Sequence, residues 1–279
     1  MTSPLITPGQ LNGLLGSATP PVVLDVRWRL DQPDGTADYL AGHIPGAVYV
    51  DLDHELAAHG EPTDGRHPLP SAAAFQESAR RWGIEDGDTV VVYDDWLGFG
   101  SARAWWMLTD AGIDARVLDG GLRAWRDAGL ALDTEDVVPA AGSVTLNPGQ
   151  LPQLTIDEAA ALAASGDGVL LDARGGDRYR GETEPIDPRA GHIPGALSAP
   201  TTENVGPDGR LRDAAELRDR FTALGVGDAP VGVYCGSGVS AAQEILALRV
   251  AGFDAALYPG SWSQWSNLPD RPVATGATP

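Results

Sequence analysis

The chain of 279 residues is 43% hydrophobic and 21% charged, an ordinary globular balance with enough length for two domains. A formal net charge of −20 argues against nucleic acid and anionic membranes as partners, and there is no run of about 18 apolar residues to suggest a membrane span. The single cysteine allows neither an internal disulfide nor a multi-cysteine metal site. All 19 basic residues are arginines, so an anionic ligand must be held by arginine or by backbone.

Short apolar runs alternate with amphipathic stretches along the first half of the chain. Residues 22–26, 90–93 and 115–118 are predicted to be buried strands, while 101–111 has the periodicity of a helix. This alternation predicts an α/β fold in which each domain is a mainly parallel sheet flanked by helices. The first ten residues lack the basic and apolar regions of a signal peptide, which predicts a cytoplasmic protein.

The pattern of the first half returns in the second half. VVLDVR at 22–27 resembles VLLDAR at 169–174, and the hexad GHIPGA at 42–47 recurs unchanged at 191–196. Corresponding positions lie about 140 to 149 residues apart, which is the length of a domain. The chain is therefore predicted to be a tandem duplication.

The boundary between the two copies is marked by composition. Residues 133–153 are acidic and rich in proline, glycine and alanine, which is typical of a linker. Thr155 followed by Glu158 predicts a capping box at the start of the next helix. We therefore expect a first domain over residues 1–132 and a second domain over 154–279.

The cysteine of the second copy, Cys235, lies where a predicted strand turns into a predicted helix. Gly236 and Gly238 allow the loop backbone to curl with its N–H groups inward, and these groups, together with those of Val239 and Ser240, are expected to bind the substrate. The helix N-terminus adds partial positive charge, a setting that favours the nucleophilic thiolate. This interpretation is preferred over that of a buried cysteine used as a small hydrophobe.

The two copies differ at this loop, because the first copy has Asp94 in place of the cysteine. Only the second copy then has a nucleophile, and we expect the first copy to contribute side chains to a shared site, with Asp53, Arg66 and His67 as candidates. The alternative for these three is an exposed loop with solvated charges.

The histidines of the hexads, His43 and His192, occur in both copies, although only one copy has a cysteine. They are therefore predicted to have structural, hydrogen-bonded roles.

The paired hexads, the CGSGVS loop at 235–240 and the GSWSQW motif at 260–265 resemble the tandem-domain rhodanese family of sulfurtransferases over nearly the whole chain. The resemblance implies two rhodanese domains, of which the second is catalytic and needs no cofactor. It also implies a cysteine persulfide that carries sulfur from a small-molecule donor to an acceptor. That acceptor is cyanide or a thiol, such as a thioredoxin-like protein or a low-molecular-weight thiol.

A loop without basic side chains resembles that of the 3-mercaptopyruvate enzymes, whereas thiosulfate enzymes tend to have basic residues there. A thiosulfate sulfurtransferase is the alternative within the family.

The resemblance also assigns roles to individual residues. Cys235 matches the sulfur-accepting cysteine, and Ser237 matches a loop serine that pairs with a histidine and an aspartate, here His67 and Asp53. Arg178 matches the first of two arginines that bind the substrate carboxylate.

The second of these arginines is missing from its usual place. The family often has Glu-Pro-Arg where this chain has Glu-Pro-Ile at 184–186, and the nearest arginine is Arg189. We expect Arg189 to reach the same anion from a shifted backbone position, or else affinity for mercaptopyruvate to be weaker.

Two functions other than sulfur transfer are compatible with a reactive loop cysteine. Related phosphatases have an arginine after five loop residues, but position 241 is alanine, so a phosphatase is disfavoured. A non-enzymatic persulfide carrier needs only the thiol. The joint presence of Ser237, His67 and Asp53 favours an enzyme.

Overall fold

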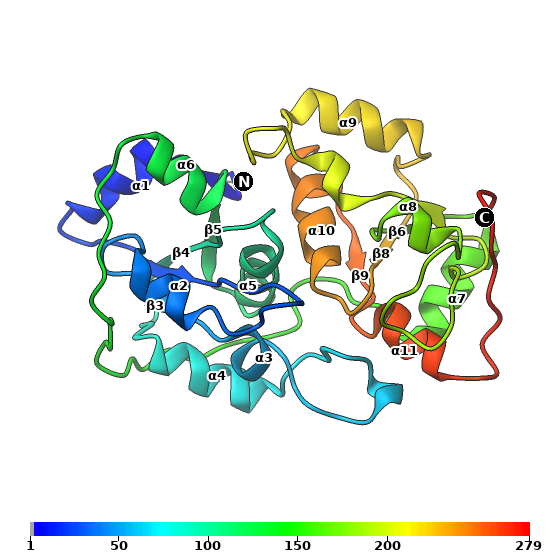
Figure 1. The fold of residues 1–279 in the computed structure, drawn as a ribbon, viewed down its shortest axis with the longest axis horizontal. Helices are drawn as coiled ribbons and strands as arrows, with labels where there is room; N and C mark the ends of the chain where they lie inside the picture. The colour runs from blue at the N-terminus through cyan, green and yellow to red at the C-terminus, as the bar shows by residue number, and fades with distance from the viewer. Residues whose placement is uncertain (1–2) are drawn as a thin grey trace. The chain divides into compact units, whose positions relative to one another are not determined.

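The computed structural model describes residues 3–279, which form two compact α/β units (Figure 1). The first unit comprises the residues up to Ala58 together with 70–151 and 206–211. The second comprises 59–69, 152–205 and 212–279. Segment 59–69, which carries Arg66 and His67, therefore packs with the second unit.

The first unit is built on a five-stranded parallel sheet with the strand order β1-β5-β4-β2-β3. The loop that follows β4 leads directly into α5, at the carboxyl edge of the sheet. The strands are β1 (Leu5–Ile6), β2 (Val22–Asp25), β3 (Val48–Tyr49), β4 (Thr89–Tyr93) and β5 (Asp114–Leu118), and the helices are α1 (Pro8–Leu15), α2 (Thr36–Ala41), α3 (Leu52–Glu55), α4 (Ala72–Arg81), α5 (Phe99–Asp110) and α6 (Gly121–Asp127).

The second unit repeats this plan with a four-stranded parallel sheet in the order β7-β6-β8-β9. Its strands are β6 (Val169–Asp172), β7 (Leu197–Ser198), β8 (Val231–Tyr234) and β9 (Ala256–Leu257), and its α-helices are α7 (Ile156–Ser165), α8 (Gly176–Tyr179), α9 (Ala214–Ala223), α10 (Ser240–Val250) and α11 (Ser261–Asn267). Two 3-10 helices, η1 (Pro62–Asp64) and η2 (Thr201–Asn204), complete the unit.

The predicted fold class is confirmed, and burial explains why the strands have the sequences they do. Every residue of β8 is buried, because helices cover a parallel sheet on both faces, so the strand is not alternately polar. The predicted capping box is also present, with Thr155 Oγ1 accepting the Glu158 N–H and the Glu158 carboxylate accepting the Thr155 N–H at 2.7 Å.

Both hexad histidines are fully buried and structural, as predicted. The His43 ring stacks on Tyr39 with 3.9 Å between ring centroids, and its Nδ1 hydrogen-bonds the Tyr39 carbonyl. His192 repeats this arrangement on Tyr179, with 3.8 Å between centroids. The repeated hexad thus leads into a strand in each unit, β3 in the first and β7 in the second.

In residues 3–279, no helix has both the length and the apolar character to cross a membrane. The same residues contain no group of three or more histidine, cysteine or acidic side chains that could hold a metal ion.

Candidate active site

Cys235 is the first residue after β8, at the carboxyl edge of the second sheet, and only 2% of it is exposed. Its Sγ accepts a hydrogen bond from the Gly238 N–H at 3.1 Å. The loop therefore curls back over its own sulfur, as predicted from the two glycines, and Gly238 adopts a positive φ of 79° to do so. A backbone donor at this position stabilises negative charge on sulfur.

The start of α11 holds the cysteine loop from the side. The Cys235 N–H donates to Ser261 Oγ at 3.1 Å, and the Cys235 carbonyl accepts the Trp262 N–H at 3.0 Å. The next carbonyl, that of Gly236, accepts the Ser263 N–H at 2.8 Å. Three backbone polar groups at the start of the loop thus hydrogen-bond with the start of α11, which holds Cys235 in place.

The predicted serine–histidine pair is present in the second unit. A hydrogen bond of 2.7 Å joins His67 Nδ1 to Ser237 Oγ, and both residues are buried. Segment 59–69 is held to α11 just before His67, because the Arg66 N–H donates to Ser263 Oγ at 3.0 Å and Gln264 Nε2 donates to the Thr63 carbonyl at 3.1 Å.

Asp53, the predicted third member, lies on α3 of the first unit. Its Oδ1 accepts a hydrogen bond from Trp28 Nε1 at 2.9 Å. Its role toward His67 stays a prediction.

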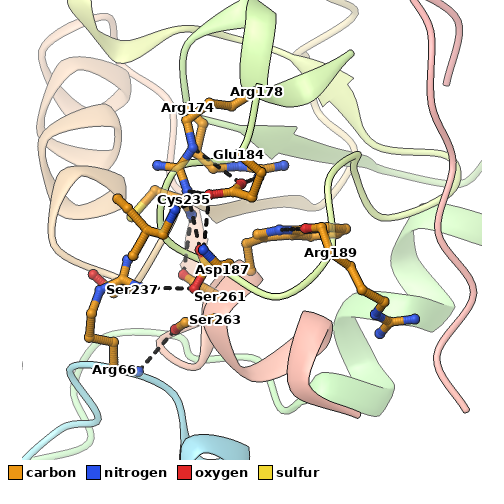
Figure 2. Close-up of polar contacts among 12 residues, drawn as sticks. Arg66, Arg174, Arg178, Glu184, Asp187, Arg189, Cys235, Ser237, Ser261 and Ser263 are labelled. Carbon is orange, nitrogen blue, oxygen red and sulfur yellow. Dashed lines mark hydrogen bonds and ion pairs between the residues drawn. The ribbon is translucent and has the colours of Figure 1, made fainter. Parts of the chain in front are cut away.

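Two guanidinium groups lie beside the cysteine loop (Figure 2). A Cβ added to Gly236 would come within 3.2 Å of Arg66 Nη2 and 3.4 Å of Arg178 Nη1. The contact with Arg66 is tighter than most side chains show, so glycine at this position leaves room for the guanidiniums. Arg178 is the predicted carboxylate ligand, and Arg66 stands next to it.

Carboxylates hold these guanidiniums from the other side. Asp187 bridges the pair, with 2.8 Å from its Oδ1 to Arg66 Nη1 and 3.1 Å from its Oδ2 to Arg178 Nη2. Glu184 lies 2.6 Å from Arg178 Nη2 and 3.3 Å from Arg174 Nη1, and Arg174 is also paired with Asp172.

Arg189, expected to supply the second carboxylate ligand, is engaged with the end of α11 and the segment after it. Its guanidinium donates four hydrogen bonds of 2.7 to 2.8 Å to backbone carbonyls, those of Trp265, Ser266, Leu268 and Arg271. The structure brings Arg66, and not Arg189, to the loop. The sequence named Arg66 as a candidate but gave it no role, because its neighbour in space, Gly236, is 170 residues away.

Sequence reasoning missed Ser261 and Asp187. Ser261 is fully buried with a positive φ of 54°, which is unusual for a residue other than glycine. The sequence did contain a signal for this conformation, because the first copy has glycine at the corresponding position, Gly121. The φ of Gly121 is 55°. Asp187 had no such signal, since its importance arises only from the arginines on either side.

Comparison with known proteins gives consistent results over the whole chain. A model of the "Rhodanese-like domain" matches residues 7–128 and again 155–268. A Mycobacterium tuberculosis protein named putative thiosulfate sulfurtransferase SseB is 51% identical, over 98% of this chain and 97% of its own length. A probable 3-mercaptopyruvate sulfurtransferase of Pseudomonas aeruginosa is 46% identical, over 91% of this chain and 92% of its own.

Solved structures agree with these sequence matches. The crystal structure of the 3-mercaptopyruvate sulfurtransferase SseA from Escherichia coli superposes with a TM-score of 0.84 at 31% identity, covering 94% of this chain and 99% of that one. A complex of EanB with hercynine has the same TM-score at 26% identity, covering 98% of this chain and 69% of that one. Two matched domains, a shared fold and relatives above 30% identity along nearly the full length lead to one conclusion: the chain belongs to the rhodanese family and contains two rhodanese-like domains.

Proposed function

We propose that this protein is a sulfurtransferase that moves the sulfur of 3-mercaptopyruvate through a persulfide on Cys235 to a thiol or cyanide acceptor. The observation that carries the proposal is the cysteine sulfur at the end of β8, which accepts the Gly238 N–H at 3.1 Å beside the Ser237–His67 hydrogen bond. A thiolate in a backbone cradle is a nucleophile, and an adjacent imidazole can move a proton. The relatives named as sulfurtransferases support it.

In the first half-reaction, the Cys235 thiolate attacks the sulfur of mercaptopyruvate. A sulfur–sulfur bond forms, the carbon–sulfur bond of the donor breaks, and its electron pair stays on carbon as the enolate of pyruvate. The relay of Ser237, His67 and Asp53 takes the proton of the donor thiol and returns it to that carbon. Pyruvate leaves, and the outer sulfur remains as an anion that the loop N–H groups stabilise.

Substrate binding rests on the guanidiniums beside Gly236. A carboxylate placed there would meet Arg178 Nη1 and Arg66 Nη2, whose sister nitrogens are engaged by Asp187. Charge-assisted hydrogen bonds from two planar groups fix both the position and the orientation of the donor. This assignment gives Arg66 the role that the sequence had left for Arg189.

In the second half-reaction, an acceptor thiolate attacks the outer sulfur and regenerates the Cys235 thiolate. We propose a low-molecular-weight thiol or a thioredoxin-like protein as the acceptor, and the cytoplasm as the place of the reaction, since thiols are kept reduced there.

Thiosulfate is the alternative donor, and one observation favours it. The loop has no basic side chain, yet Arg66 and Arg178 bring two guanidiniums to its first glycine. The relative named putative thiosulfate sulfurtransferase is 51% identical, so both donors are to be measured.

The decisive experiment compares the two donors on the purified protein. Initial rates of pyruvate release from mercaptopyruvate and of sulfite release from thiosulfate give kcat/KM for each. We expect mercaptopyruvate to have the larger value, and a preference for thiosulfate would replace this proposal by the alternative. If neither donor leaves sulfur on the protein, as intact mass would report, a sulfurtransferase function is excluded.

A further inference from the structure

The ion pairs beside the cysteine loop form a cluster with no net charge. Three guanidiniums, those of Arg66, Arg174 and Arg178, are matched by the three carboxylates Asp172, Glu184 and Asp187. The side chain of Asp187 is only 3% exposed, whereas those of Arg66 and Arg178 are 24% and 19% exposed. The cluster thus offers solvent two donor groups above a buried carboxylate.

Asp187 binds one nitrogen of each of these two arginines, and a different nitrogen of each lies nearest the loop. Asp187 binds Arg66 Nη1 and Arg178 Nη2, while Arg66 Nη2 and Arg178 Nη1 lie nearest to Gly236. In the described part of the chain, no hydrogen-bond acceptor reaches the buried Nε of Arg66. The arrangement keeps N–H groups available for an incoming oxyanion, but it has already neutralised the positive charge behind them.

This combination bears on which donor the site takes. A monoanion such as mercaptopyruvate needs a few directed hydrogen bonds and one compensating charge. Thiosulfate carries two negative charges. Thiosulfate and Asp187 would bind the same two guanidiniums, so the Asp187 carboxylate repels the second charge of thiosulfate. We propose that Asp187 is a specificity-determining residue that makes the site select monoanionic over dianionic sulfur donors.

The inference rests on the proposed function, because it concerns the choice between the two donors of that reaction. Electrostatic repulsion grows with the charge of the ligand, so removing the Asp187 charge strengthens the binding of both donors and strengthens that of the dianion more. For partly exposed groups in about 0.1 M salt, we expect the difference between the donors to be about tenfold.

The test compares Asp187→Asn with the wild type on both donors. The ratio of kcat/KM for thiosulfate to that for mercaptopyruvate should rise about tenfold in Asp187→Asn. Asp187→Glu keeps the charge and should keep the wild-type ratio within about twofold. Glu182→Gln is the matched control, because Glu182 is exposed and paired with Arg180, so it removes the same charge elsewhere on the same segment. An unchanged ratio in Asp187→Asn, or an equal rise in Glu182→Gln, would overturn the inference.

A binding measurement separates this inference from the function itself. Protection of Cys235 from the neutral reagent iodoacetamide, titrated with pyruvate or with sulfate, reports the affinity for a monoanion and a dianion without any turnover. In the wild type, sulfate should protect Cys235 much more weakly than pyruvate does. In Asp187→Asn, the affinity for sulfate should increase more than the affinity for pyruvate.

If Asp187→Asn does not fold, Asp187→Ser replaces it. The comparison of sulfate with pyruvate in the wild type then tests the same inference. Equal protection by both anions in the wild type would then be decisive against selection. Absence of a sulfur adduct with either donor would refute the proposed function and leave the anion measurement standing.

Discussion

The loops that follow β4 and β8 occupy the same place in the two units, and one of them carries its own anion. In the first unit, the Asp94 carboxylate accepts the N–H groups of Trp96, Gly98 and Ser101 and the Ser101 hydroxyl, at 3.0 to 3.1 Å. In the second, the corresponding residue is Cys235, whose sulfur accepts the Gly238 N–H at 3.1 Å. The same strand–loop–helix frame thus surrounds a carboxylate in one copy and a thiol in the other, which is why we propose that only the second copy carries the chemistry.

The surroundings of the two loops are otherwise preserved. The Leu122 N–H donates to the Asp94 carbonyl at 2.9 Å, as the Trp262 N–H does to the Cys235 carbonyl at 3.0 Å. A Cβ on Gly121 would lie 2.4 Å from the Asp94 carbonyl oxygen, so only glycine fits in the first copy. The second copy has Ser261 instead, in a backbone conformation that costs about 1 to 3 kcal/mol, and its hydroxyl accepts the Cys235 N–H.

The largest effect predicted from this comparison is that of removing the thiol. Cys235→Ser should abolish sulfur loading, because an alcohol in the same cradle is not ionised and cannot accept sulfur. Intact mass after treatment with donor should rise by about 32 Da, one sulfur atom, in the wild type and not in the variant. An adduct that survives the substitution would place the chemistry outside this loop.

The next effect concerns the proton relay proposed beside Cys235. His67→Ala should lower mercaptopyruvate turnover by about 10² to 10⁴, because the enolate that leaves needs a proton. Thiosulfate turnover should fall much less, since sulfite leaves without one. His54→Ala provides the control, because this histidine is an exposed residue beside Asp51. Equal losses on both donors would remove the relay from the mechanism.

A smaller effect is expected from the guanidinium pair. Arg178→Lys and Arg66→Gln should each raise KM for mercaptopyruvate about tenfold or more, because neither replacement reproduces a planar, charged donor. Their kcat values should change less than KM. Arg180→Lys is the matched control, because Arg180 is an exposed arginine paired with Glu182. If Arg189→Lys alone raised KM, the site would depend on the arginine expected from sequence.

Several of these features followed directly from the residue pattern. The repeat, the parallel sheets and the curled loop at Cys235 depend on local periodicity and on glycine, which a sequence displays. The positions of Arg66 and Asp187 depend on how segments 59–69 and 184–189 fold against the loop, and such distant contacts leave no periodic signal. The role expected of Arg189 rested on its being the nearest arginine in sequence, whereas in the structure its guanidinium donates to four backbone carbonyls after Gln264.

The smallest effect tests the filled cradle of the first copy. Burial raises the pKa of Asp94 from its ordinary 3.8 to about 6, against the opposing influence of the hydrogen bonds that its carboxylate accepts. The folded protein therefore binds the Asp94 proton more tightly than the unfolded chain does between these two values. Stability must fall as pH rises through that window and level off above pH 6.

Asp94→Asn removes this titration and provides the reference. From pH 5 to 7.5 the unfolding free energy of the wild type should fall by about 1 to 1.5 kcal/mol relative to Asp94→Asn, as the linkage relation gives for a carboxyl with these two pKa values. Urea unfolding of both proteins at three pH values measures the difference. The amide also changes hydrogen bonds with Ser101, but that effect is independent of pH and cancels in the slope. If the difference in unfolding free energy between the two proteins stays constant across this range, Asp94 does not titrate there. The hydrogen bonds that lower its pKa would then outweigh the burial that raises it.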